Sequence, residues 1–254
     1  MDRELHSKRA SRMDPITSTA AAGIRARMEA LDLLANNLAN SGTPGFKADR
    51  EAYRLYTSAE STGGMVWSPV IEAHVTDFSQ GQIAATSTPS DIAISGDGFL
   101  VADGPRGPVL TRNGKLHVTQ EGKLVTMQGY ELAMIEPRRI RLNPQLPFEV
   151  GVDGSVVQDD VTVGHIRIGE APNGVQPTKQ EGAYFQLDLD QIRTLPPDRY
   201  QIRQGYLESS NSSPAEASVK LIGILRQFES LQRAMQMGGE MGRKAVEDVA
   251  RVTP

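Results

Sequence analysis

The residues of this chain that could do chemistry are four histidines, two acidic pairs and one glycine-rich turn. His6, His74, His117 and His165 could bind a metal or move protons, but no two of them stand at a metal-ligand spacing such as His-Glu-x-x-His. His74 and His117 alternate with apolar residues, which predicts solvent-facing positions on strands. The histidines therefore indicate neither a metal site nor acid–base catalysis.

The acidic pairs and the glycine-rich turn also lack the surroundings that chemistry would need. Asp159-Asp160 and Asp188-Leu189-Asp190 have no glycine-anchored loop around them, and surface turns explain both pairs. Gly96-Asp97-Gly98 begins like a dinucleotide-binding loop, but the next segment predicts a strand, whereas phosphate binding needs a helix N-terminus. A cell-wall hydrolase would need a carboxylate pair in a cleft, and no Asp or Glu is framed for it. We therefore expect no enzyme, no catalytic residue, no metal site and no cofactor.

Composition narrows the class of protein further. The chain has 254 residues with 39% hydrophobic and 23% charged residues, no cysteine and a formal net charge of −4. This charge argues against nucleic-acid binding. The dense basic cluster Arg138-Arg139-Ile140-Arg141 alternates with apolar residues, which favours the solvent face of a strand over a phosphate site. No apolar run reaches about 18 residues, so no membrane span is expected.

The elements that must carry the function are two long helices at the ends of the chain. Residues 15–40 predict a helix that begins with proline and stops at Asn40 to Gly42. Thr43-Pro44-Gly45-Phe46 then fits a type II turn, with proline and glycine at its centre. Apolar residues of this helix recur at four-three spacing, which is a heptad seam: Ile24, Met28, Leu31, Ala35 and Leu38.

Residues 213–252 predict a second helix with a matching seam. Ser213-Pro214-Ala215-Glu216 is a capping box with proline at the first helical position. The seam includes Leu221, Ile224, Phe228 and Leu231. Three glycines within residues 238–242 weaken a helix; we expect the helix to end or kink near Gly238, the alternative being close backbone approach through Gly238 and Gly242.

Between the helices the sequence predicts an antiparallel β domain. Alternating apolar and polar residues surround turn signals at Asn113-Gly114, Glu121-Gly122, Gln128-Gly129 and Asp153-Gly154, each of which predicts a hairpin. The predicted class is α+β, in which the terminal helices pair and pack in an assembly, because two helices alone leave a wide apolar stripe uncovered. The expected segments are a disordered tail or misplaced start (1–12), the first helix (13–42), a connecting segment with strands (43–91), the β domain (92–205) and the C-terminal helix (206–254).

Three blocks of the sequence carry a family resemblance. "LDLLANNLANSGTPGFKAD" resembles the N-terminal signature of bacterial flagellar rod and hook proteins. "DFSQGQIAATSTPSDIAISGDGFLV" resembles the internal block of that family, and "YLESSNSSPAEASVKLIGILRQFES" resembles its C-terminal block. Ser212 and Ala217 depart from the valine and methionine that the family favours, and Ser41-Gly42 departs from its usual pair.

The resemblance implies a structural subunit of the flagellar basal-body rod. Such proteins leave the cell through the flagellar type III export apparatus without a cleaved signal peptide and assemble in the periplasm into a hollow shaft. The implied partners are other copies of the chain and other rod proteins, with the helices as an inner tube and the β domain as an outer layer. The length and the brief segment before the D-F-S block favour a proximal rod subunit; the alternatives are a distal rod subunit and, more remotely, a secreted binding module.

Two groups of residues are expected to carry this function. The first group would form the assembly contacts between helices: Ile24, Met28, Leu31, Leu38, Leu221, Ile224, Phe228 and Leu231. The second group would form a joint that redirects the chain from the inner tube to the outer layer, with the aromatic ring as an anchor: Thr43, Pro44, Gly45 and Phe46.

Overall fold

The computed structural model describes residues 15–60 and 64–252, and the expectations for residues 1–12 lie outside the described part. The chain divides into two compact units. We call Met1–Asn37, Asp49–Thr76 and Pro214–Pro254 the helix–hairpin unit, and Leu38–Ala48 with Asp77–Ser213 the β unit. The chain therefore passes between the units four times. The α+β class is confirmed.

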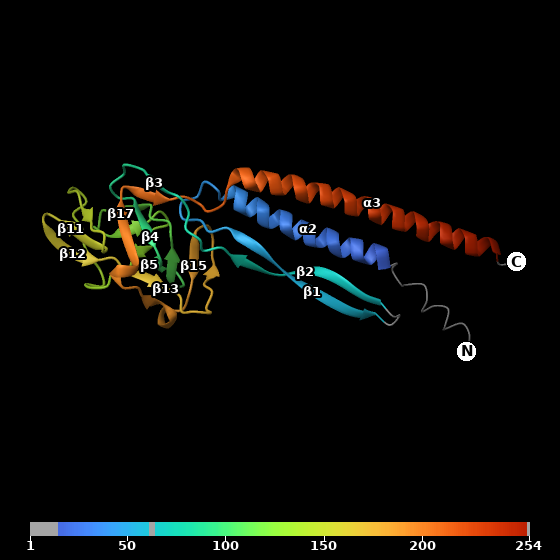
Figure 1. Ribbon diagram of the computed structural model, residues 1–254. Helices are drawn as coiled ribbons and strands as arrows, with labels where there is room; N and C mark the ends of the chain where they lie inside the picture. Colours follow the sequence, from blue (N-terminus) through green and yellow to red (C-terminus); the bar gives the residue numbers. More distant parts are fainter. Residues whose placement is uncertain (1–14, 61–63, 253–254) are drawn as a thin grey trace. The chain divides into compact units, whose positions relative to one another are not determined.

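The helix–hairpin unit holds two antiparallel helices that run side by side (Figure 1). These are α2 (Pro15–Ala39) and α3 (Pro214–Val252), whose proline starts agree with the predicted ones. A Cβ atom on Gly23 would lie 3.2 Å from both methyl carbons of Leu231, so this glycine makes room for a leucine of the other helix. The small residue therefore provides space for the Leu231 side chain.

The prediction that the second helix ends or kinks at its glycine-rich stretch is wrong. α3 continues without interruption through residues 238–242 to Val252. Gly238 is buried, whereas a Cβ on Gly239 or Gly242 would meet no atom within 4 Å. Glycine costs a helix about 1 kcal/mol relative to alanine at each position, and the remaining turns of this 39-residue helix offset that cost. The helix starts at Pro214, and residues 206–208 are instead a strand.

A long β-hairpin completes the helix–hairpin unit. It consists of β1 (Asp49–Glu60) and β2 (Gly64–Thr76), paired antiparallel from Asp49 opposite Thr76 to Glu60 opposite Gly64. Asn37 at the end of α2 fixes its base, because its Nδ2 donates to the Asp49 carbonyl at 2.8 Å and the Asp49 amide donates to its Oδ1 at 3.0 Å. The asparagine therefore links helix and hairpin within this unit.

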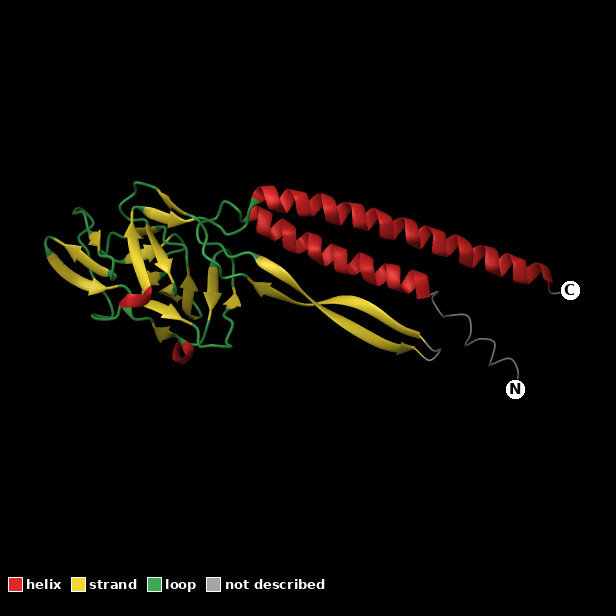
Figure 2. Cartoon of the chain, viewed as in Figure 1, coloured by secondary structure: helices red, strands yellow, loops and turns green. Residues whose placement is uncertain are grey.

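The β unit consists of short antiparallel strands joined by loops and two short helical turns (Figure 2). Its largest sheet follows the order β14-β15-β6-β5-β9-β8-β7, with β13 pairing both β5 and β16. The strands of this sheet are β5 (Phe99–Gly104), β6 (Gly107–Thr111), β7 (Leu116–Val118), β8 (Leu124–Thr126), β9 (Glu131–Leu132), β13 (Ile168–Glu170), β14 (Thr178–Lys179), β15 (Tyr184–Gln186) and β16 (Arg193–Thr194).

Three smaller sheets and the helical turns complete the β unit. The three-stranded sheet is β10 (Glu149–Val150), β11 (Ser155–Gln158) and β12 (Val161–His165). The two pairs are β3 (Ile83–Ala85) with β18 (Tyr206–Glu208), and β4 (Ile92–Gly96) with β17 (Tyr200–Gln204). The 3₁₀ turns are η1 (Leu189–Gln191) and η2 (Pro197–Arg199).

Three of the four predicted hairpins are confirmed. Gly122, Gly129 and Gly154 have φ values of 77°, 82° and 90° in turns between paired strands. The hairpin at Asn113-Gly114 is wrong, because β6 pairs with β5 and β15 while β7 pairs with β8. A Cβ on Gly114 would lie 1.7 Å from the Ile92 carbonyl oxygen, so this glycine serves close packing and not a reversal of direction.

Two smaller predictions have different outcomes. His74 in β2 and His117 in β7 are exposed strand residues, as expected. The basic cluster at residues 138–141 is not on a strand; its arginines are exposed in an irregular segment while Ile140 is buried. The predicted strand is therefore wrong, although the exposed arginines and the buried Ile140 follow the alternation of the sequence.

A continuous apolar core fills the β unit. Its interior includes Ile94, Leu100, Ile166 and Ile168, each at most 2% exposed. A second cluster gathers around Phe185, whose ring centroid lies 5.2 Å from that of Phe78 and 5.9 Å from that of Phe99. The two apolar clusters together form the interior on which the loops of the β unit are held.

Candidate functional site: helix surfaces and a buried junction

The predicted seam of α2 is largely uncovered. Met28 is 54% exposed and Leu38 is 37% exposed, while Ile24 and Leu31 are half-buried. The most buried residues lie one position earlier in the heptad: Ala30, Leu34 and Asn37. The most buried face of α2 therefore runs through Ala30, Leu34 and Asn37, and the predicted seam flanks it.

The predicted seam of α3 is partly covered, and one of its residues lies against α2. Leu221, Ile224, Phe228 and Leu231 are all half-buried, and Leu231 packs at Gly23. A second apolar face of α3 is exposed, with Val219 at 72%, Ile222 at 54% and Leu225 at 44%. α3 thus has one apolar face within the chain and another that is open.

The predicted joint has the geometry of a type II turn. The Phe46 amide donates to the Thr43 carbonyl at 3.3 Å, and Gly45 has a φ of 67°. Phe46 is 1% exposed, and the Lys179 ammonium lies 4.1 Å from the centre of its ring. The turn and its aromatic residue belong to the β unit.

Directly after the joint lies a buried cluster of three charges, which we call the buried junction: Lys47, Arg112 and Glu208. The Glu208 carboxylate accepts from Lys47 Nζ at 2.6 Å through Oε1 and from Arg112 Nη1 at 3.1 Å through Oε2. Both Lys47 and Glu208 are fully buried, and Arg112 is 6% exposed. The cluster has two positive charges and one negative charge, and backbone carbonyl groups accept the remaining hydrogen bonds of Lys47 and Arg112.

Backbone groups from two further segments surround the buried junction. Lys47 Nζ donates to the Ser79 carbonyl at 2.7 Å, and the Gly81 amide donates to Glu208 Oε1 at 2.9 Å. Arg112 Nη2 donates to the Gly96 carbonyl at 2.7 Å. Burial lowers the pKa of Lys47 and of Arg112, and the adjacent Glu208 carboxylate partly opposes this lowering.

Asn211 binds the two residues at which the chain leaves and re-enters the β unit. Its Oδ1 accepts from the Ala48 amide at 2.7 Å, and its Nδ2 donates to the Asp77 carbonyl at 2.7 Å. Its own amide donates to the Phe46 carbonyl at 3.3 Å. Ala48 and Asp77 are the residues at which the chain leaves and re-enters the β unit, and they are joined directly by a bond from the Asp77 amide to the Ala48 carbonyl at 2.8 Å.

Sequence reasoning missed the charged members of the junction. Lys47 directly follows the T-P-G-F motif, and Glu208 and Asn211 belong to the L-E-x-S-N motif. Their position inside the signature blocks was the available signal. It was overlooked because lysine and glutamate are almost always exposed unless they are paired.

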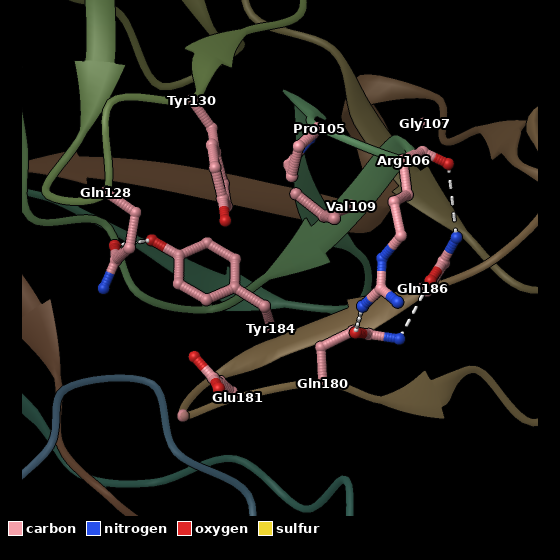
Figure 3. A pocket seen from close by; sticks show the side chains of 11 residues that line it. Pro105, Arg106, Gly107, Val109, Gln128, Tyr130, Gln180, Glu181, Tyr184 and Gln186 are labelled. Carbon is pink, nitrogen blue, oxygen red and sulfur yellow. Dashed lines mark hydrogen bonds between the residues drawn. The ribbon is translucent and has the colours of Figure 1, made fainter.

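A pocket of about 340 Å³ opens elsewhere on the β unit (Figure 3). Its polar side chains bind one another: the Tyr184 hydroxyl donates to Gln128, Arg106 donates to Gln180 at 2.6 Å, and Gln180 donates to Gln186 at 2.8 Å. Glu181 is the one carboxylate among the lining residues, so the lining supplies no pair of acids for glycoside hydrolysis.

Within residues 15–60 and 64–252, no group of three or more histidine, aspartate and glutamate residues could hold a metal ion. Over the same residues, neither helix combines the length and hydropathy that spanning a bilayer requires.

Comparison with known proteins places these features in a family. The model described as "Flagella basal body rod protein" matches residues 18–47, the "Flagellar hook protein FlgE/F/G D1 domain" matches 93–170, and the "Flagellar basal body rod FlgEFG protein C-terminal" matches 203–247. The flagellar basal-body rod protein FlgF of Caulobacter vibrioides is 33% identical over 229 residues, which cover 87% of this chain and 92% of that protein. The chain belongs to the FlgF family of flagellar basal-body rod proteins.

Other relatives agree with this family. FlgF of Salmonella typhimurium is 31% identical over 85% of this chain and 91% of that protein. FlgG of Buchnera aphidicola subsp. Schizaphis graminum is 27% identical over 91% of this chain and 98% of that protein. The FlgF relatives are the more similar, and as a member of their family the chain is a structural protein of the flagellar rod.

Each of the three matched regions supplies a member of the buried junction. Lys47 is the last residue of the first region, Arg112 lies in the second, and Glu208 and Asn211 lie in the third. The three regions of this chain that match flagellar rod and hook models therefore meet at one point of the fold.

Proposed function

We propose that this FlgF-family chain is a subunit of the proximal rod and polymerises through α2 and α3 into the wall of the hollow shaft. The observation that supports this most is the uncovered apolar surface of α2, where Met28 and Leu38 stay exposed after α3 has packed against the helix. Burial of apolar surface in an assembly contributes about 25 cal/mol per Å². These residues therefore gain stabilisation when another subunit covers them.

The proposed contacts divide into two sets. Leu221, Ile224, Phe228 and Leu231 hold α3 against α2 and so shape each subunit's helix pair. Contacts with neighbouring subunits come from the open faces of both helices: Ile24, Met28, Leu31 and Leu38 on α2, and Val219, Ile222 and Leu225 on α3.

The joint at Thr43, Pro44, Gly45 and Phe46 redirects the chain from helix to β unit, with Phe46 as its anchor in the core. The chain reaches the periplasm through the flagellar type III export apparatus without a cleaved signal peptide. Its partners are copies of itself and other rod proteins, and it binds no nucleic acid and catalyses no reaction. The FlgG-like distal position is the second candidate, supported by FlgG relatives that match over most of their length.

Charge insertion into the helices tests this function. Leu31→Asp places a carboxylate on the α2 surface proposed for neighbouring subunits, and Phe228→Asp places one between α2 and α3 of the same subunit. Each is expected to block assembly. Gln227→Asp adds the same charge at an exposed position next to Phe228 and is the matched control. Basal bodies purified from each strain are analysed by mass spectrometry, and hydrogen exchange of residues 92–205 reports whether the β unit has folded.

The expected result is loss of both Asp variants from basal bodies while their β units remain protected from exchange. Rods built normally by Leu31→Asp and Phe228→Asp would contradict the assembly role of the helices. In the unmodified strain, low stoichiometry relative to the other rod proteins supports the proximal position, and high stoichiometry supports the distal one.

A further inference from the structure

We propose that the buried junction, together with Asn211, is a mechanical clamp that lets the β unit resist force applied through the two ends of the chain. Force on the chain ends reaches the β unit at Leu38 and at Ser213, where its first segment begins and its last segment ends. The load therefore passes between residues 45–48 and residues 208–211. The direct bonds between these two segments, and the contacts that brace them, resist the opening of the β unit under this load.

Four hydrogen bonds join the two segments. The Gly45 amide donates to the Glu208 carbonyl at 2.7 Å, and Lys47 Nζ donates to the Glu208 carboxylate at 2.6 Å. The Asn211 amide donates to the Phe46 carbonyl at 3.3 Å, and the Ala48 amide donates to Asn211 Oδ1 at 2.7 Å. The two backbone–backbone bonds, Gly45 with Glu208 and Phe46 with Asn211, follow the same order in both segments, so the two segments run in parallel.

This parallel order determines how force acts on the bonds. Tension pulls residues 45–48 toward the N-terminus and residues 208–211 toward the C-terminus, so the two segments are sheared past each other. In shear all the bonds are loaded together and must break nearly at once, whereas an unzipped pair breaks one bond at a time. The Lys47–Glu208 bond is charge-assisted and buried, which makes it one of the stronger bonds of this set.

Further contacts brace the sheared pair. Arg112 holds the second oxygen of the Glu208 carboxylate and is itself bonded to the Gly96 carbonyl of β4. Residues 77–81 accept from Lys47 and Asn211 and donate to Glu208. The clamp is thus attached to the core of the β unit and does not depend on the two terminal segments alone.

The clamp is a property of the folded chain, while its use in a rotating rod rests on the proposed function. The first test pulls the purified full chain by its two ends in an optical trap at constant force. Asn211→Ala removes the side-chain bonds to Ala48, Asp77 and Ser79. Gln158→Ala is the matched control, since its side chain also makes several bonds in the β unit, but only to Asn143, Leu146 and Pro147.

Loss of the Asn211 side-chain bonds, which break in the transition state, is expected to raise the unfolding rate of the β unit under force about tenfold or more. Gln158→Ala is expected to leave that rate nearly unchanged, although both variants lower the urea midpoint. Equal force-dependent rates for the two variants would overturn the clamp. If Asn211→Ala does not fold, Asn211→Asp keeps the acceptor for Ala48 and loses the donor to Asp77, and its rate must lie above that of the unmodified chain.

A second test examines the rod itself. Cells that carry Asn211→Ala are expected to shed flagella in viscous medium and to keep them in dilute medium, while Gln158→Ala cells keep them in both. A clamp that weakens in the trap without shedding in cells would refute its use in the rod and leave the mechanical property intact. Absence of both variants and of the unmodified chain from basal bodies would contradict the proposed function instead.

Discussion

Substitution of Gly45 by alanine tests how the joint is built into the β unit. Gly45 has a φ of 67°, which favours glycine, and a Cβ at this position would lie 2.2 Å from both the carbonyl carbon of Arg112 and the amide nitrogen of Asn113. Both atoms belong to the backbone and cannot rotate away as a side chain would. Gly45→Ala must therefore displace either the joint or the loop that carries Arg112.

The size of the effect follows from these two terms. A left-handed backbone costs a residue with a Cβ about 1–2 kcal/mol, and overpacking a tight site costs about 1–3 kcal/mol. Alanine recovers about 0.4–1 kcal/mol by restricting the unfolded chain. The expected loss in the free energy of unfolding of the β unit is therefore about 2–4 kcal/mol.

Gly129→Ala is the matched control for this experiment. Gly129 has a φ of 82° in a hairpin turn, but a Cβ there would meet no atom within 4 Å. It carries the backbone strain without the clash, so its expected cost is about 1 kcal/mol.

Urea unfolding of the full chain, followed by circular dichroism and by hydrogen exchange of residues 92–205, measures both variants. With a slope of about 2 kcal/mol per molar urea, the midpoint of the β-unit transition should fall by about 1–2 M for Gly45→Ala. If Gly45→Ala costs no more than Gly129→Ala, the close contact with Arg112 does not exist in solution and the packing of the joint is misjudged.

Three further substitutions have distinct expected outcomes. Asn37→Ala should speed hydrogen exchange of the β1–β2 hairpin near Asp49, because it removes the two bonds between helix and strand; unchanged exchange would contradict that link. Gly23→Ala should change the thermal stability of the helix pair little, because two effects oppose each other. Alanine gains about 1 kcal/mol in helix propensity, but its Cβ would lie 3.2 Å from the methyl groups of Leu231, which must shift to make room. A fall of several degrees in the melting temperature would show that Leu231 cannot shift. Hydrogen bonds from Ser155 hold the pKa of Asp153 below its usual 3.8, so Asp153 contributes stability above that pH and loses it as the pH falls through its folded pKa. Ser155→Ala should therefore lower stability at neutral pH, and in acid titrations its difference from the unmodified chain should shrink below about pH 4.

The helices could be predicted from the sequence because their signals are local. Proline at the first helical position, apolar residues at four-three spacing and the Thr43-Pro44-Gly45-Phe46 turn all act within a few residues of one another. Gly122, Gly129 and Gly154 could be predicted for the same reason, since a hairpin turn requires a positive φ where it occurs. Asn113-Gly114 has the same hairpin sequence, but Gly114 is needed there because its backbone packs against the carbonyl of Ile92, which is distant in the sequence.

The orientation of α2 could not be predicted from its own sequence. Apolar residues at four-three spacing predicted a seam through Met28 and Leu31, whereas the most buried face runs through Ala30 and Leu34. The spacing of apolar residues within one helix does not say where its partner lies, and the partner decides which face is covered. The seam that remains open is the surface proposed for neighbouring subunits.

The buried junction was missed because its members meet across 161 residues of chain. Burying three charges is costly, and replacing such a cluster by apolar residues is often neutral or stabilising at equilibrium. Equilibrium stability therefore does not explain why Lys47, Arg112 and Glu208 are inside. Apolar residues would fill the same space without fixing one segment against the other, whereas the Lys47–Glu208 bond has a defined length and direction. A bond of that kind resists sliding between residues 45–48 and 208–211, and that resistance is what a subunit loaded through its chain ends requires.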